Sequence, residues 1–362
     1  MMQPAEPEAS DQITIEELQL AARNHGMPLE ALRYEITPVG LHYLLIHYDI
    51  PAIDPGSWNL TVSGRVRKPL TLSLDDILSR PAVTLPVTME CAGNGRARLS
   101  PRPLSQPWLS EAIGTGEWTG ISLVGLLSEA EPDVSAAEVV FTGADHGVEG
   151  GVEQDYARSL PLDEAMKDTV ILAYKLNGQL LPPQHGFPLR LVVPGWYGMT
   201  SVKWLRSIEV VSEPFRGYQQ VRGYRYRQDP DEVGEPVTRI APRALMLPPG
   251  SPEFMTRDRV VPRGPCRLEG RAWSGWGPIE RVEVTADGGR SWAPARLGSP
   301  PGPTAWTPWS FDWTAEPGSY VLMCRARDAT GREQPMMPEW NVGGYANNSV
   351  QRVRVTVAAS PA

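Results

Sequence analysis

The chain has 362 residues, of which 41% are hydrophobic and 21% are charged, and this is the composition of a soluble globular protein with room for two domains. Its formal charge of −8 argues against a broad nucleic-acid surface, and three scattered cysteines are too few for a disulfide framework or a cysteine-based zinc site. No stretch approaches the roughly 18 apolar residues of a membrane-spanning helix.

The N-terminal part, residues 1–34, is expected to be a tail followed by a short helix. Residues 1–12 are acidic and lack the basic flank and apolar stretch of a signal sequence, so we expect them to be disordered and the protein to be cytoplasmic. Residues 13–24 space their apolar side chains as a helix does, and Gly26 provides a stop.

Residues 35–240 mix helical and extended patterns, which predicts a mixed α/β domain. Ser73 and Ser122 each precede a short apolar run and are good helix N-caps, so helices are expected over 73–78 and 123–129. A further helix is predicted over 162–167, and strands are predicted over 58–62, 138–141, 170–174 and 187–193.

The composition and the pattern of apolar residues change after residue 211. Residues 214–240 are polar and read as a connecting segment. From residue 259 onward, apolar runs at 279–284, 320–325 and 350–357 are separated by turn signals about every ten residues, which is typical of an antiparallel β-sandwich. The sequence thus predicts an α+β protein whose mixed α/β domain precedes an immunoglobulin-like sandwich over 241–362.

The common nucleotide and hydrolase motifs are missing. The Gly93–Gly95 run lacks the third glycine of a dinucleotide fingerprint, and no P-loop, H-E-x-x-H or G-x-S-x-G occurs. Cys91 instead precedes a loop rich in glycine and arginine, where positive charge favours a thiolate, the soft ligand that transition metals prefer. The alternative for Cys91 is a small buried apolar side chain, which is what we expect of Cys266 and Cys324.

A second group of polar residues surrounds the apolar run at 187–193. Arg190 interrupts that run, so its guanidinium must reach water, a carboxylate or a bound anion, and taken singly a buried salt bridge is the favoured explanation. Ser201 and Lys203 follow within one short loop and favour the oxyanion or phosphate of a cofactor. A metal site from His42, His47 and His146 is also conceivable, although their spacing is not a usual ligand spacing.

Together these segments resemble the sulfite oxidase family of molybdenum enzymes over residues 35–358. The stretch Cys-Ala-Gly-Asn-x-Arg at 91–96 is similar to the loop that holds the metal ligand. Asp145, the His-Gly-Phe-Pro-x-Arg run at 185–190 and the Ser-Val-Lys-Trp run at 201–204 resemble the cofactor-binding pattern. Residues 282–292 and 338–341 are similar to the family's C-terminal dimerisation sandwich.

The resemblance implies Mo-molybdopterin as cofactor, Cys91 as the metal ligand, and a homodimer. The net charge and the lack of a long apolar stretch predict that the protein binds neither nucleic acid nor a membrane. The catalytic residues it implies are Cys91, Arg96 and Tyr224, with Tyr218 as the alternative tyrosine. The cofactor-binding residues it implies are Tyr43, His47, Cys91, Asp145, His185, Arg190, Ser201, Val202 and Lys203. The expected reaction is two-electron oxygen-atom transfer on a small anionic or oxo substrate with an unidentified electron acceptor. A pterin-binding protein that has lost turnover is the alternative.

Two departures concern the substrate. Where the family has an arginine two residues before His47, this chain has Leu45, and Trp309 or a neighbour is expected near the place of another arginine. No Cys-x-x-Cys-His haem motif occurs. Losing two guanidinium groups predicts weak binding of sulfite and a pocket that suits a larger or less charged substrate.

Overall fold

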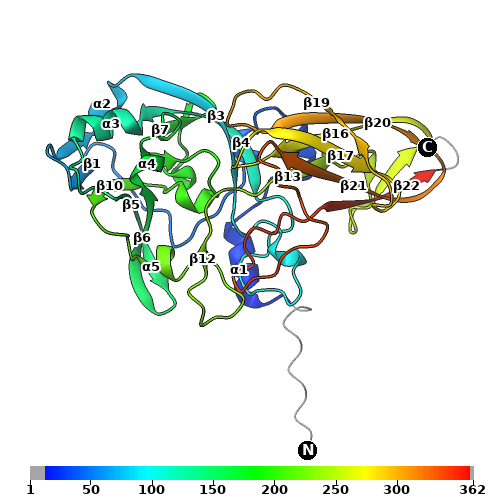
Figure 1. Cartoon of the computed structure of the whole chain (residues 1–362), viewed down its shortest axis with the longest axis horizontal. Coiled ribbons are helices and arrows are strands. Elements are labelled where there is room, and N and C mark those ends of the chain that lie inside the picture. The colour runs from blue at the N-terminus through cyan, green and yellow to red at the C-terminus, as the bar shows by residue number, and fades with distance from the viewer. Residues whose placement is uncertain (1–12, 359–362) are drawn as a thin grey trace, which may run out of the picture.

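Two five-stranded sheets build the first part of the computed structural model, which describes residues 13–358 (Figure 1). One sheet has the order β2 (Leu70–Ser73), β1 (Asn59–Gly64), β10 (Leu205–Val211), β5 (Glu138–Glu149) and β6 (Val152–Pro161). The other contains β3 (Ala82–Glu90), β4 (Ile113–Ser122), β7 (Ile171–Leu176) and β8 (Gln179–Leu180), and β9 (Arg190–Val192) pairs with β7. The largest apolar core of the protein lies here and includes Leu60, Phe141 and Leu191.

Three short helices of this part begin within one residue of the predicted start. In α2 (Leu74–Leu78), the Ser73 side chain accepts a hydrogen bond from the Asp76 amide and the Asp76 carboxylate accepts one in return, which is a capping box. The Ser122 hydroxyl caps α3 (Leu123–Ala130) in the same way, by accepting from the Gly125 amide. α4 (Leu162–Ala165) is a single turn, shorter than expected.

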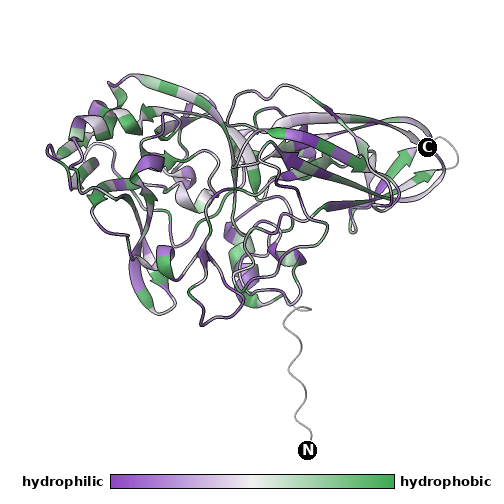
Figure 2. Cartoon of the chain, viewed as in Figure 1, coloured by the Kyte–Doolittle hydropathy of each residue, from purple (hydrophilic) through white to green (hydrophobic). Residues whose placement is uncertain are grey.

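The second part is a β-sandwich of a four-stranded and a six-stranded sheet, so the predicted fold class is confirmed. The first sheet contains β13 (Arg243–Leu247), β16 (Gly264–Trp273), β20 (Thr307–Ala315) and β19 (Arg296–Leu297). The second contains β14 (Ser251–Pro252), β15 (Arg259–Pro262), β22 (Gln351–Ala358), β21 (Gly318–Asp328), β17 (Ile279–Thr285) and β18 (Ala293–Pro294). Side chains along β22 alternate between buried and exposed, and green and purple segments follow one another along the sandwich strands in Figure 2.

A third apolar cluster joins the two parts. Met27 precedes the turn η1 (Leu29–Arg33), and Leu32 lies within it. Both pack with Tyr197 of the first part and with Leu245 and Trp273 of the sandwich. The helix α1 (Ile15–Arg23) lies beneath this junction in Figure 1. Because the two parts share a core, their relative position is fixed by packing rather than by the connecting chain alone.

Three expectations need correction or fall outside the description. The strand expected over 187–193 is only β9, and the connecting segment 214–240 is not featureless, since it holds α5 (Tyr218–Val221), β11 (Arg225–Tyr226) and β12 (Glu235–Pro236). The tail expected at residues 1–12 lies outside the described residues. Within residues 13–358, no helix is both long and apolar enough to cross a membrane.

Candidate active site

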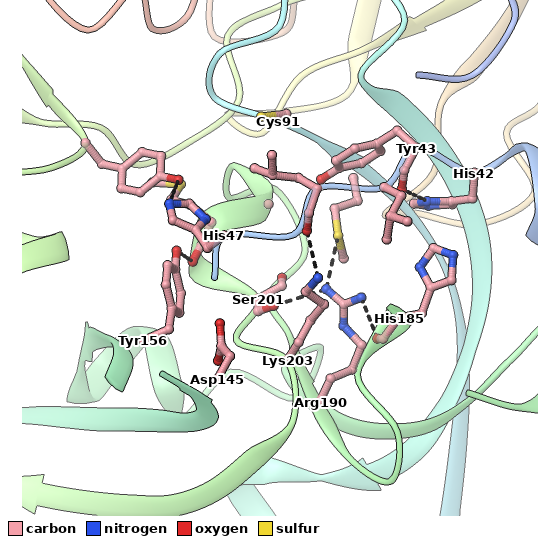
Figure 3. A pocket seen from close by; sticks show the side chains of 16 residues that line it. His42, Tyr43, His47, Cys91, Asp145, Tyr156, His185, Arg190, Ser201 and Lys203 are labelled. Atoms are coloured by element: carbon pink, nitrogen blue, oxygen red, sulfur yellow. Dashed lines mark hydrogen bonds between the residues drawn. The ribbon is translucent and has the colours of Figure 1, made fainter. Parts of the chain in front are cut away.

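An inner cavity of the first part brings together most of the residues that the sequence singled out. Of the candidate residues, His42, Tyr43, His47, Cys91, Asp145, His185, Arg190, Ser201, Lys203 and Tyr224 line it (Figure 3). The other lining residues, which the sequence did not predict as site residues, are Leu44, Leu45, Met89, Tyr156, Gly198 and Met199. They come from the loop after η2 (Val39–Leu41), from β3, β5 and β6, and from the segments on either side of β9. Residues far apart in sequence therefore converge on one concave site.

Two buried cations form the floor of this cavity. Arg190 is 4% exposed, and its Nη1 and Nη2 donate to the carbonyls of His185 and Ser201, each at 3.0 Å. The Lys203 ammonium donates to the Leu45 carbonyl at 2.7 Å. Neither makes an ion pair with a carboxylate anywhere in residues 13–358, and burial lowers the pKa of Lys203 to about 7. Their hydrogen bonds go to carbonyls and to the Met89 sulfur, and Asp145 is a nearby acidic group that makes no ion pair with either cation in residues 13–358. Such buried cations favour a bound anion.

The remaining polar groups are held neutral or unpaired. Asp145 stands on β5 at an irregularity in its pairing with β6, its Oδ1 has no hydrogen-bond partner, and burial raises its pKa to about 7. Burial lowers the pKa of His47 to about 3 and that of His42 to about 4, so both rings are neutral at physiological pH. These groups are available to hydrogen-bond a polar, uncharged ring system.

Cys91 lies where β3 ends, and its backbone amide donates to the Ala112 carbonyl at 2.9 Å. The expected activation of its thiol is wrong for the free chain, because burial raises the pKa of Cys91 more than the nearby Arg96 lowers it. A thiolate at this position therefore requires a metal to displace the proton. A Cβ at Gly93 would lie 2.6 Å from the Arg96 guanidinium, so glycine lets the arginine fold back over the loop.

On the other side of Cys91 lies an outer cavity of about 270 Å³. Cys91, Leu45, His47 and Tyr224 line both cavities, so Cys91 lies at their junction. Arg96 lines the outer cavity and is held by the carbonyls of Gly343 and Gln106, at 2.9 and 3.1 Å.

Tyr224 faces Cys91 from the connecting segment. Its hydroxyl lies 3.3 Å from His47 Nε2, and its backbone has φ of 43°, a strained value for a residue other than glycine. Tyr218, the alternative tyrosine, lines neither cavity. Of the two candidates Tyr218 and Tyr224, it is Tyr224 that the structure brings to this site.

Two expected residues lie elsewhere. The Val202 side chain packs into the core of the first part, and its backbone amide and carbonyl bond Thr200 and Leu191. His146 is exposed and binds the carboxylates of Asp155 and Glu153, at 2.9 and 3.0 Å. No group of three or more metal-binding His, Cys, Asp or Glu side chains occurs in the described part of the chain, so the conceivable histidine site is not formed.

The sandwich supplies a wall of the outer cavity that the sequence did not reveal. Trp309 is not part of it, because this side chain is buried in the sandwich core. The segment between β21 and β22 instead reaches across, and Tyr345 lines the cavity with the Arg96 guanidinium 5.4 Å from its ring centre. The sequence near Tyr345 contains only the stretch at 338–341, which resembles the family's dimerisation sandwich and gives no indication of a site residue.

Arg158 on β6 is a second residue that the sequence did not reveal. Its guanidinium is buried, donates to the Gln219 carbonyl and lies 5.5 Å from the centre of the Tyr224 ring. It makes no ion pair with a carboxylate in residues 13–358. A third uncompensated positive charge therefore lies behind the tyrosine.

Comparison with known proteins agrees with this arrangement. The family model "Oxidoreductase molybdopterin binding domain" matches residues 47–219, and "Mo-co oxidoreductase dimerisation domain" matches residues 243–358. Sulfite oxidase of Gallus gallus is 37% identical over 337 residues, which are 88% of this chain and 72% of that protein. An NADH nitrate reductase of Ulva prolifera is 31% identical over 90% of this chain, which spans 41% of that relative.

The fold has a solved counterpart. The crystal structure of the sulfane dehydrogenase SoxCD from Paracoccus pantotrophus superposes with a TM-score of 0.79 at 26% identity, and the match covers 99% of this chain and 96% of that one.

Proposed function

The chain belongs to the sulfite oxidase family of molybdopterin oxidoreductases, and from this premise we propose that it catalyses two-electron oxygen-atom transfer at a molybdenum bound by Cys91. The observation that carries the proposal is the position of Cys91 at the junction of two cavities. One cavity has the chemistry of a cofactor cradle, and the other is open to a substrate.

The inner cavity fits a phosphate-bearing pterin. Arg190 and Lys203 are buried cations without carboxylate partners in residues 13–358, which is what a phosphate requires. The unpaired Oδ1 of Asp145 and the neutral rings of His47 and His185 offer hydrogen bonds to a heterocycle. When bound, the cofactor supplies the redox and oxygen-atom chemistry, and the protein orients it.

The residues of the outer cavity would handle the substrate. Arg96 is fixed by two carbonyls and still has Nη2 without a hydrogen bond in the described residues, so it can hold one oxygen of an oxyanion. The Tyr224 hydroxyl can hydrogen-bond to His47 Nε2, which lies 3.3 Å away on a neutral ring, and this contact orients the hydroxyl. Leu45 contributes an apolar surface beside them.

Metal content and turnover test this proposal together. We expect about one molybdenum per chain in the purified protein and reduction of ferricyanide with a suitable oxyanion substrate. Cys91→Ser should abolish turnover, because an alkoxide is a harder and poorer donor than a thiolate for this metal. Cys266→Ser, at a half-buried sandwich position, is the matched control and should keep metal and turnover.

The outcomes separate the candidate functions. Bound molybdenum without turnover of any oxyanion or sulfoxide would favour the alternative of a non-catalytic pterin-binding protein. Full turnover in Cys91→Ser would show that the ligand assignment is wrong.

A further inference from the structure

The size of the outer cavity exceeds what a small inorganic oxyanion needs. Its volume of about 270 Å³ is close to the lower end of pockets that hold organic ligands. An ion of four heavy atoms would leave space for several water molecules, since each takes roughly 30 Å³ in the liquid. The cavity therefore has room for a substituent on the oxyanion.

The charge facing this cavity is low for a dianion. Arg96 and Arg23 are the two cations that line it, and the Glu149 carboxylate lines it as well. Arg23 is exposed and donates to the His47 carbonyl at 3.4 Å, while His47 itself is neutral because burial lowers its pKa to about 3. One buried guanidinium and one exposed one, opposed by a carboxylate, match a single negative charge better than two.

Apolar side chains form another part of the wall of this cavity. Leu45 and Ile46 come from the loop before His47, Trp108 from the loop after Cys91, and Val148 from the end of β5. Val148 is 67% exposed, which places the apolar wall at the mouth of the cavity as well as inside it. Such a surface gains from the burial of a hydrocarbon group and gains nothing from a hydrated inorganic ion.

Taken together, we propose that the substrate is an organic oxyanion, a singly charged oxoacid with an apolar substituent, and that Leu45 selects for that substituent. This inference rests on the proposed function. The oxyanion lies at Arg96 beside Cys91, and the substituent lies along Leu45, Ile46 and Val148. For a sulfinate of this class, one oxygen atom from water is added to sulfur to give the sulfonate, two protons are released, and two electrons pass to two equivalents of a one-electron acceptor such as ferricyanide.

Binding of unreactive product-like anions to the molybdenum-loaded protein tests the inference. Titration calorimetry with sulfate, methanesulfonate and benzenesulfonate compares a dianion with two monoanions, and the two sulfonates differ from each other only in the size of the apolar group. We expect affinity to rise along this series, with benzenesulfonate bound at least about tenfold more tightly than sulfate. Equal or tighter binding of sulfate would overturn the inference.

Substitutions then test whether Leu45 and Val148 favour anions with an apolar substituent. Leu45→Ala should weaken benzenesulfonate binding about fivefold or more and leave sulfate unchanged, whereas Leu45→Arg should favour sulfate. Leu104→Ala removes an exposed leucine that does not line the cavity, and it should change neither affinity. If Leu45→Ala loses the metal, Val148→Ser at the exposed rim takes its place and should also weaken benzenesulfonate selectively.

The two proposals fail in different ways. Absence of molybdenum from the purified protein would remove the proposed function, whatever the anions do. If the molybdenum-loaded protein keeps the same relative affinities for the three anions when Leu45 or Val148 is substituted, only the inference of an organic oxyanion substrate is refuted.

Discussion

Arg190 and Lys203 are buried cations without a carboxylate ion pair in residues 13–358, and only Lys203 is attracted by a nearby carboxyl group, that of Asp145, so the loss of either cation should affect mainly cofactor binding. Arg190→Ala or Lys203→Ala should each weaken cofactor retention by about 1.5–3 kcal/mol, because each removes a charge-assisted contact to phosphate. The cofactor-free variants should be as stable as the parent, or more so, because a buried charge has been removed. Molybdenum retained after dialysis, and thermal unfolding of the cofactor-free chains, are the measurements.

Lys167→Ala is the control for this prediction, because Lys167 is exposed and pairs with Glu164 at 2.7 Å, away from the cradle. Equal losses of stability in cofactor-free Arg190→Ala and in the loaded protein would mean that the arginine is structural.

Asp145 predicts a pH dependence of the cofactor-free chain. Its pKa is about 7 in the fold, against an ordinary value of 3.8, because burial disfavours the carboxylate despite the attraction of Lys203. Between about pH 4 and 7 the folded chain therefore keeps a proton that the unfolded chain has released, so this contribution to stability is lost as the pH rises. Asp145→Asn cannot ionise, and its advantage in the free energy of unfolding should grow from near zero at pH 4 to at most about 3–4 kcal/mol above pH 7.

Denaturant unfolding at a series of pH values measures this difference. Asp163→Asn removes an exposed carboxylate from the first turn of α4, which has no part in the shift of Asp145, and should not reproduce the rise. A constant difference between Asp145→Asn and the parent from pH 4 to 8 would contradict the burial of this carboxyl group.

Among the elements, the loop after β3 carries Cys91, the metal ligand that we propose, and is fixed by a buried network to the sandwich. Glu90, directly before Cys91, forms an ion pair with Arg243 of β13 at 3.1 Å and accepts from Trp273 of β16 at 2.7 Å. Asn94 in the loop donates to the same carboxylate at 2.9 Å. The position of Cys91 thus depends on strands of both parts.

Breaking this network should destabilise the whole chain. Arg243→Met leaves the Glu90 carboxylate buried without its partner, and we expect a loss of about 3–5 kcal/mol in the free energy of unfolding, with faster release of molybdenum. Adding Glu90→Gln should recover part of the loss, because the buried charge is then gone as well. Arg296→Met, which breaks an exposed pair with Asp312, is the control and should lie within about 1 kcal/mol of the parent. An Arg243→Met chain as stable as the parent would show that the pair contributes nothing.

Local chemistry explains which elements could be predicted from the sequence. Ser73 and Ser122 allowed α2 and α3 to be predicted, because a helix N-cap hydrogen-bonds only to backbone within one turn of the chain. Arg190 could be singled out because it interrupts an apolar run. Tyr345 and Arg158 could not be singled out in this way. Tyr345 contacts Arg96, and Arg158 contacts Tyr224, in each case between segments far apart in sequence, and no local sequence pattern indicates such a contact.

At the scale of the whole molecule, we predict a homodimer that meets through the sandwich, residues 240–358. The match of residues 243–358 to a dimerisation domain supports it. The edge strands β14 and β18 are two residues long and each contains a proline, so edge-to-edge pairing is discouraged and sheet faces or loops are the expected contact. Sedimentation velocity of the full chain measures the mass, and a monomer at micromolar concentration would refute the prediction.

Because Gly343 and Tyr345 reach from the sandwich to Arg96, the second part of the chain contributes to the outer cavity as well as to the dimer that we predict. An exchange of residues 243–358 between relatives would transplant one face of the substrate cavity while leaving the pterin cradle intact. Substrate preference could then diverge through changes in a loop between β21 and β22, far in sequence from every residue that holds the cofactor. Engineering of this scaffold toward new oxyanions therefore has a natural starting point in its C-terminal half.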